Sequence, residues 1–363
     1  MISKLCSLWA ADKGMNTLEM SRISVALAQW TFDATNKLSY RSVHASRPER
    51  LLAHLGKMVL APLVNKFGAR EVVSASLFGR TLLMPAEHPL PATMARFPQY
   101  NSPLLLAVDA IAAQTVSPVS IIDVGANVGD TVAMIEQHRP GFSSFLCIEA
   151  DSRLAELCSL NHADNPRVIV KRCFIGEEEG AAVWLHDDGR ANPSTKLALT
   201  DQMSDPSNYD RLTRMDKAAS EFVEKTGNLS MIKVDTEGYD FSVLRSGPNL
   251  LREYQPSILF EWFPKLLEGL NEPVWSGFEY LGLFGYRHFV FFTNRGDFYC
   301  KISDPDRLFL RSLASVALRD SGVGYFDVFA STQVAICEHL VEASIELMSN
   351  TPAPNNSHVP LQK

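Results

Sequence analysis

The chain has 363 residues, 46% of them hydrophobic and 21% charged, with a formal net charge of −7 at pH 7. This length fits one large domain with an extension, or two domains, and the composition is that of an ordinary globular protein. A net negative charge gives no electrostatic reason to bind a phosphate backbone, so we expect no nucleic-acid partner. No apolar run reaches the roughly 20 residues that span a bilayer, and the 6 cysteines form no C-x-x-C pair, which indicates reduced thiols in a cytoplasmic protein.

Residues 1–115 are expected to form a mainly helical extension with a short β element. Apolar residues recur at spacings of three and four over 18–38 and 49–67, which predicts helices there. The segment 79–85 predicts a strand that a proline ends, and residues 104–113 are expected to form a helix leading into the main domain. The extension could also supply a homodimer interface.

From residue 116 to residue 349, apolar runs typical of buried strands alternate with helical patterns. This alternation predicts a mostly parallel sheet of crossover units with helices on both faces. The polar segment 186–211 has few apolar anchors and is expected to act as a lid, and residues 350–363 are expected to be disordered. The expected strands are 119–124, 144–149, 168–170, 181–185, 229–235, 257–261, the hairpin strands 288–293 and 297–302, and 325–331, followed by a helix over 333–348.

A glycine-bracketed turn follows the first of these strands. Gly125 removes a side chain where the backbone turns, and Gly129 permits the close approach of a ligand or of neighbouring backbone. A dinucleotide requires G-x-G-x-x-G so that a helix N-terminus can hold its pyrophosphate, and these two glycines have a different spacing. We therefore expect a cationic, phosphate-free cofactor in a turn that includes Ala126 and Asn127, with the Asp123 carboxylate near its positive charge.

An acidic residue also ends the second strand. Glu149 is placed where a carboxylate can accept both hydrogen bonds from a ribose diol. Asp151 follows closely, and it either assists in binding the cofactor or caps the next helix. The two glycines, the ribose carboxylate and the strand order together predict a nucleoside-containing cofactor at the carboxyl edge of the sheet.

These features resemble the FkbM-type methyltransferases, and the resemblance extends over about residues 119–331. The segment 212–216 follows the family pattern only loosely, and residues 79–100 resemble the element that often precedes the family's core. The matching stretches are Asp-Val-Gly-Ala-Asn-Val-Gly (123–129), Ile-Glu-Ala-Asp (148–151), Leu157 to Asn161, Ile-Lys-Val-Asp-Thr-Glu-Gly-Tyr-Asp (232–240), Val243 to Gly247, Pro256 to Glu261, and the hairpin around Gly296.

The resemblance implies an α/β class I methyltransferase fold, which is Rossmann-like, with a mostly parallel sheet of about seven strands. It implies transfer of a methyl group from S-adenosylmethionine to a hydroxyl of a small molecule, a sugar or glycan or a secondary metabolite. In such a displacement the protein aligns the reactants and removes the hydroxyl proton. Asp235 or Glu237 is the candidate base, unless Glu237 caps a helix and Asp235 only orients its loop.

The acceptor site is expected near the end of the fifth strand. Glu261 could accept a hydrogen bond from a substrate hydroxyl, with Trp262 beside it, although Glu261 could also be structural. Asp235, Glu237 and Glu261 could supply oxygen ligands to a divalent metal, and the sequence does not decide this, so no metal is assigned. His186, in the expected lid, is a further candidate base.

Two other functions share parts of this pattern. An NAD-dependent oxidoreductase would use the same sheet and the same ribose carboxylate, but the third glycine of its phosphate-binding turn is absent. A cofactor-binding protein of the same fold without turnover is the second alternative, because a fold alone does not establish catalysis. Binding of the two cofactors separates the first alternative from a methyltransferase.

Overall fold

The computed structural model describes residues 26, 28–37, 71–115, 117–183, 210–319 and 322–350. The predicted helix at 49–67, nearly all of the segment 186–211 including His186, and the tail after residue 350 lie outside these residues. Residues 28–37 are helical, as predicted. Within the described ranges, no helix combines the length and the apolar content needed to cross a membrane.

Eight strands form the main sheet of the described chain, in the order β12-β11-β13-β10-β9-β3-β4-β5. The five strands from β10 to β5 are parallel, whereas β13, β11 and β12 join antiparallel. The predicted α/β architecture is confirmed, with one strand more than the seven or so expected because both arms of the hairpin extend the sheet. The bounds are β3 Val119–Val124, β4 Ser143–Glu149, β5 Val168–Arg172, β9 Met231–Val234, β10 Ser257–Trp262, β11 His288–Thr293, β12 Phe298–Ser303 and β13 Phe326–Ser331.

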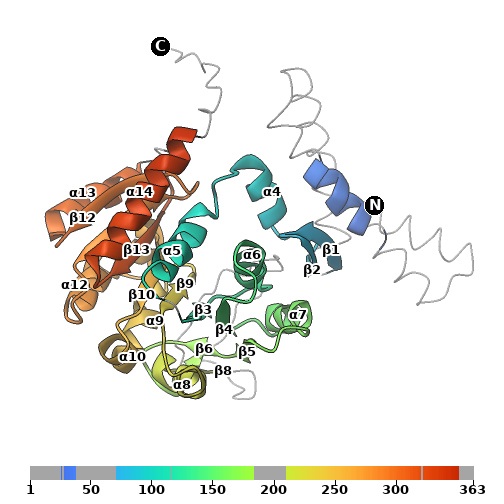
Figure 1. Cartoon of the computed structure of the whole chain (residues 1–363), viewed down its shortest axis with the longest axis horizontal. Helices are drawn as coiled ribbons and strands as arrows, with labels where there is room; N and C mark the ends of the chain where they lie inside the picture. Colours follow the sequence, from blue (N-terminus) through green and yellow to red (C-terminus); the bar gives the residue numbers. More distant parts are fainter. Residues whose placement is uncertain are drawn as a thin grey trace, which may run out of the picture.

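Helices cover both faces of this sheet (Figure 1). All six residues of β3 are buried, and its neighbouring side chains alternate between two apolar layers. Ile121 packs in the layer formed with helices α5 (Ser102–Ala112), α6 (Asp130–His138), α7 (Ser152–Asn161) and α14 (Val334–Asn350). Ile122 packs in the opposite layer, formed with α8 (Met215–Thr226), α9 (Asp240–Arg245), α10 (Pro248–Glu253), α11 (Pro264–Gly269), α12 (Ser276–Gly282) and α13 (Arg307–Leu318).

The order in which the chain adds strands to the sheet reverses between the central parallel strands β3 and β9. From β3 the chain crosses to β4 and β5 on one side, and it then returns to β9 and β10 on the other side. Loops at the carboxyl ends of the two central strands therefore lead away from each other, which opens a crevice for a ligand at that edge. A separate small sheet consists of β6 (Phe174–Ile175), β8 (Asp210–Thr213) and β7 (Ala182–Val183), and its first strand follows β5 in the chain. It contains the short strand predicted near 181–185.

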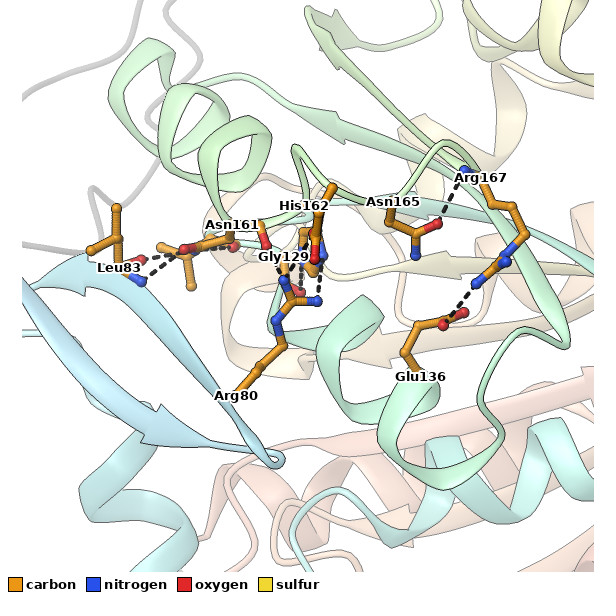
Figure 2. A network of polar contacts seen from close by, with 10 residues as sticks. Arg80, Leu83, Gly129, Glu136, Asn161, His162, Asn165 and Arg167 are labelled. Atoms are coloured by element: carbon orange, nitrogen blue, oxygen red, sulfur yellow. Dashed lines mark hydrogen bonds and ion pairs between the residues drawn. The ribbon is translucent and has the colours of Figure 1, made fainter.

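A hairpin of β1 (Val72–Leu77) and β2 (Arg80–Pro85) packs against α7. The sequence predicted only its second strand. The Asn161 side chain accepts a hydrogen bond from Leu83 N at 2.7 Å and donates to the carbonyl oxygens of Leu83 and Val128, each at 2.9 Å. Figure 2 shows this network, in which Arg80 also donates to the carbonyl of Asn161 and His162 contacts the carbonyl of Gly129 at 2.8 Å. The hairpin is thereby fixed to the glycine turn that follows β3.

We expect Asn161→Ala to lower the free energy of unfolding by about 2–4 kcal/mol, because it leaves one buried and two partly buried backbone groups without their partner. Asn161 is buried, and the hydrogen-bonding atoms of its side chain all have partners in the hairpin or the turn. Urea unfolding measures the loss, and the exposed Asn249→Ala serves as the control for removing an asparagine side chain. Equal stability of the two variants would contradict the role assigned to this network.

Candidate active site

A cavity of about 400 Å³ lies at the carboxyl edge of the parallel strands. Its walls come from the loops after β3, β4, β9 and β10, from the start of β13, and from residues 88–104, which include α4 (Leu90–Arg96). The extension therefore contributes directly to the cavity wall. Four of the predicted cofactor residues line it, namely Gly125, Asn127, Glu149 and Asp151, together with Asp235, Glu237 and Glu261.

Glu149 is held rigidly at one end of the cavity. Its Oε2 accepts the backbone N–H of Asn127 at 2.8 Å, and its Oε1 accepts the backbone N–H of Asp151 at 2.8 Å. Burial raises the pKa of this carboxyl to about 7, although both N–H groups act in the opposite direction. Each carboxylate oxygen keeps a second acceptor position, so both oxygens can still accept hydroxyl donors from a ribose.

The turn between β3 and α6 is shaped by glycine. Gly125 has φ +84°, and a Cβ there would overlap the carbonyl oxygen of Asp235, so the loops after β3 and β9 meet at this point. Gly129 does not line the cavity; a Cβ there would collide with His162 and Cys158. Ala126 is buried in the core, and it also lies outside the cavity wall. Gly129 and Ala126 therefore shape the turn on its core side, away from the cavity.

The Asp151 carboxylate caps helix α7. Its Oδ1 accepts the backbone N–H groups of Arg153 and Leu154 at 2.8 and 3.0 Å. The capping interpretation is thus confirmed, and because Asp151 also lines the cavity, the cofactor interpretation stays a prediction.

His88, from the extension, fixes the side chain of Asn127. Its Nδ1 accepts the backbone N–H of Leu90 at 3.3 Å, so its Nε2 carries the proton that faces Asn127 Oδ1 at 3.0 Å. Burial lowers the pKa of His88 to about 4, which keeps the ring neutral near pH 7. His88 could not be identified from the sequence, because only the fold brings the extension over the turn.

Asp123 and Asp235 are joined by one cation. Lys233 lies opposite Asp123 in the β3–β9 register, and its Nζ contacts Asp123 Oδ1 at 3.1 Å and Asp235 Oδ2 at 3.4 Å. Asp123 is fully buried and does not line the cavity, whereas the Asp235 side chain is 48% exposed and does line it. The structure thus corrects the direct contact expected between Asp123 and the cofactor: Asp123 acts by holding Lys233.

The loop after β9 is organised by Asp240. Its Oδ2 accepts from the hydroxyl of Thr236 at 3.1 Å, and its Oδ1 accepts the backbone N–H of Glu261 at 3.1 Å. Helix α9 has Tyr239 at its N-cap, so Glu237 is not the capping residue. Glu237 has φ +51° and lines the cavity, and burial raises its pKa, assisted by the charge of Asp235.

The other end of the cavity holds a pair of carboxyl groups, of which only Glu261 was predicted from the sequence. Glu261 of β10 lies opposite Asp327 of β13 in the antiparallel register, and both line the cavity. Burial raises the pKa of Glu261 well above its usual value and that of Asp327 to about 8, and the negative charge of Asp235 adds to both shifts. Because β13 runs antiparallel to β10, its first residues had to meet the carboxyl end of β10, which is the signal that could have found Asp327.

Two tyrosines lie next to this pair. The hydroxyls of Tyr100 and Tyr325 are 3.5 Å apart, and both residues line the cavity. Tyr100 is positioned by the β11–β12 hairpin, because Gly296 approaches the backbone of Gln99 so closely that a Cβ would overlap its carbonyl. The glycine of this hairpin therefore serves the site by placing a residue of the extension.

The prediction that Trp262 binds substrate is wrong. Trp262 is fully buried, donates its indole N–H to the carbonyl of Val274 at 2.9 Å, and stacks edge-on against Phe278 and Phe291. Side chains alternate along a strand, so Trp262 and Glu261 must face opposite sides of the sheet. Phe263, one residue further on, lines the cavity instead.

Metal binding requires several ligands that converge on one point. Among the described residues, no group of three or more His, Cys, Asp and Glu side chains has that arrangement, Asp235, Glu237 and Glu261 included.

We expect Asp327→Asn to increase stability more at pH 9 than at pH 5. A carboxyl whose pKa is raised in the folded state stabilises the fold below its unfolded pKa of about 4, and that contribution is lost as the pH rises towards the folded value of about 8. Asparagine does not ionise, so its stability advantage over Asp327 should grow from pH 5 to pH 9 by about 4 kcal/mol. Thermal unfolding at pH 5, 7 and 9 tests this, and an advantage that shrinks with pH would contradict it.

Part of the chain matches a known protein family. Residues 123–273 match the family model described as the methyltransferase FkbM domain, a range that contains the turn after β3, Glu149, the β9 loop and Glu261. Asp327, Tyr100 and Tyr325 lie outside the matched range. No curated protein matches the chain.

Solved structures give weaker likenesses. The chain has 12% identity and a TM-score of 0.37 to a METTL16 MTase domain, covering 70% of this chain and 74% of that one. It has 9% identity and a TM-score of 0.30 to precorrin-6y C5,15-methyltransferase from Geobacter metallireducens GS-15, covering 62% and 86%. The plantazolicin methyltransferase BpumL, solved with a pentazolic desmethylPZN analog and SAH, gives 11% and 0.33, covering 84% and 98%. Similarities of this size say nothing about substrate.

Proposed function

We propose that this chain, which carries a methyltransferase FkbM domain over residues 123–273, transfers a methyl group from S-adenosylmethionine to a hydroxyl of a small molecule, such as a sugar or a secondary metabolite. The observation that carries this proposal is one cavity with two unlike ends. A ribose-type carboxylate, Glu149, stands at one end, and the carboxyl pair of Glu261 and Asp327 stands at the other. Asp235 also lines this cavity.

The residues present fit the cofactor. Glu149 has two fixed oxygens with free acceptor positions for a ribose diol, and the turn at Gly125 lies beside it without a side chain. The acidic wall suits a positive sulfonium, and S-adenosylmethionine bound there would supply an electrophilic methyl group. A dinucleotide fits less well, because α6 begins with Asp130, whose carboxyl lines the cavity at the helix terminus where a pyrophosphate would bind.

Within this proposal, Asp235 accepts the proton of the acceptor hydroxyl. Lys233, only 14% exposed, places its ammonium 3.4 Å from Asp235 Oδ2 and so holds this carboxylate in position at the cavity wall. The buried Asp123 carboxylate in turn accepts a hydrogen bond from Lys233 Nζ. Asp240 connects the β9 loop to the end of β10 by accepting the backbone N–H of Glu261. Glu237, the other candidate, has no cation within ion-pair distance among the described residues, which favours Asp235 as the base.

We also propose which parts of the chain bind the cofactor and the acceptor. Residues 116–349 form the cofactor-binding domain, and the extension, residues 1–115, lines the cavity with His88 at the cofactor end and with Tyr100 at the acceptor end. The direct test uses S-adenosylmethionine with a labelled methyl group and a panel of hydroxylated acceptors. NMR of the product should show a new methyl ether, and a methyl group on nitrogen, carbon or sulfur would contradict O-methylation.

A further inference from the structure

The far end of the cavity is unusually rich in hydrogen-bond acceptors. Glu261 and Asp327 face each other across β10 and β13, and the hydroxyls of Tyr100 and Tyr325 lie beside them. Three of these four residues lie outside the range of the family match. We call these four residues, Glu261, Asp327, Tyr100 and Tyr325, the acceptor floor. The inference about them rests on the proposed methyl transfer.

One oxygen of the acceptor floor has no partner. Glu261 Oε2 is buried and accepts no hydrogen bond from any described residue, although the Glu261 side chain lines the cavity. A buried polar atom without a partner costs free energy, and such atoms are few in folded proteins. The cost is removed when a ligand places a hydrogen-bond donor at this oxygen.

The charges of the described cavity wall exclude one kind of ligand. Asp130, Glu149 and Asp151 line one part of it, and four further carboxyl residues line the rest, namely Asp235, Glu237, Glu261 and Asp327. Lys233 is the one lysine or arginine in that wall, and Asp123 and Asp235 already share its ammonium. A phosphate or carboxylate of the acceptor, placed beside Glu261 and Asp327, would lose its hydration there without gaining a cation.

We propose that the methyl acceptor is a polyhydroxy compound without negative charge, which donates a second hydroxyl to Glu261 Oε2 while the reacting hydroxyl meets Asp235. The acceptor floor thereby selects against phosphorylated and carboxylated acceptors. A hydroxyl can both donate to a carboxylate and accept from a protonated carboxyl or a tyrosine, so it is compatible with either protonation state of the pair. An amino group at the same place would be attracted further by the carboxylates.

The test titrates the protein, saturated with S-adenosylhomocysteine, with four pyranosides of one skeleton. The probes are methyl glucoside, methyl glucosaminide, methyl glucuronide and methyl glucoside 6-phosphate, and saturation-transfer NMR reports their affinities. The amino and neutral forms should bind at least about tenfold more tightly than the two anionic forms. Glu261→Gln should weaken the neutral form by about tenfold, whereas the exposed Glu224→Gln on α8 should leave its affinity unchanged.

The outcomes separate this inference from the proposed function. Tighter or equal binding of the anionic forms, or binding of none of the four while S-adenosylhomocysteine still binds, would overturn the acceptor class and leave methyl transfer standing. Failure of S-adenosylhomocysteine to bind would overturn both. Because the order of the four affinities in the unmodified protein is itself decisive, the inference does not depend on the folding of any variant.

Discussion

Glu149→Ala is expected to weaken binding of S-adenosylhomocysteine by about 100-fold or more, which corresponds to the loss of two hydrogen bonds to a charged group. The substitution also removes the acceptor of the backbone N–H groups of Asn127 and Asp151, so the turn that forms the pocket loses its support. Isothermal titration calorimetry measures the affinity. Glu156→Ala, an exposed position on α7, is the matched control and should bind as the unmodified protein does.

A second substitution distinguishes direct binding from simple loss of a side chain. In Glu149→Gln the amide nitrogen can replace only one oxygen, and it would face a backbone N–H that it cannot accept from. We therefore expect Glu149→Gln to bind little better than Glu149→Ala. Near-normal affinity in either variant, with the fold intact by circular dichroism, would show that the ribose does not bind Glu149.

Asp235→Asn is expected to reduce turnover by about 100-fold to 10,000-fold while the affinity for S-adenosylhomocysteine stays within a few-fold, because a general base contributes about that much to a proton transfer. Asparagine keeps the size of the side chain, and Lys233 retains Asp123 as its partner. Single-turnover transfer of a labelled methyl group measures the rate, and calorimetry on the same sample measures the affinity.

Glu237→Gln is the matched comparison, because both carboxylates line the cavity on the same loop. If Asp235 is the base, Glu237→Gln should retain most of the activity. Loss of activity in Glu237→Gln with little loss in Asp235→Asn would transfer the role to Glu237. Equal loss of affinity and of turnover in Asp235→Asn would instead assign Asp235 a structural or cofactor-binding role.

The cofactor end of the site could be predicted from the sequence because its residues are local to strand ends. A buried run followed by Gly125, and an acidic residue at the end of the next strand, place Gly125 and Glu149 together in any parallel sheet of this order. The structure confirms that both line one cavity. Gly129 and Ala126 belong to the same predicted cofactor turn, but in the structure buried side chains contributed by distant segments surround them.

The acceptor end could be predicted only in part because antiparallel strands and the extension build it. Asp327 reaches the cavity through the pairing of β13 with β10, and Tyr100 reaches it through the contact between Gln99 and Gly296. Neither contact leaves a local pattern in the sequence. The error at Trp262 had a simpler cause, because strand alternation already requires adjacent residues to face opposite sides.

Titration of the unmodified protein with S-adenosylhomocysteine and, separately, with NAD shows whether the cavity at the carboxyl ends of β3 and β9 binds S-adenosylmethionine. We expect micromolar binding of S-adenosylhomocysteine and no measurable binding of NAD. Binding of NAD, or of neither compound, would contradict it.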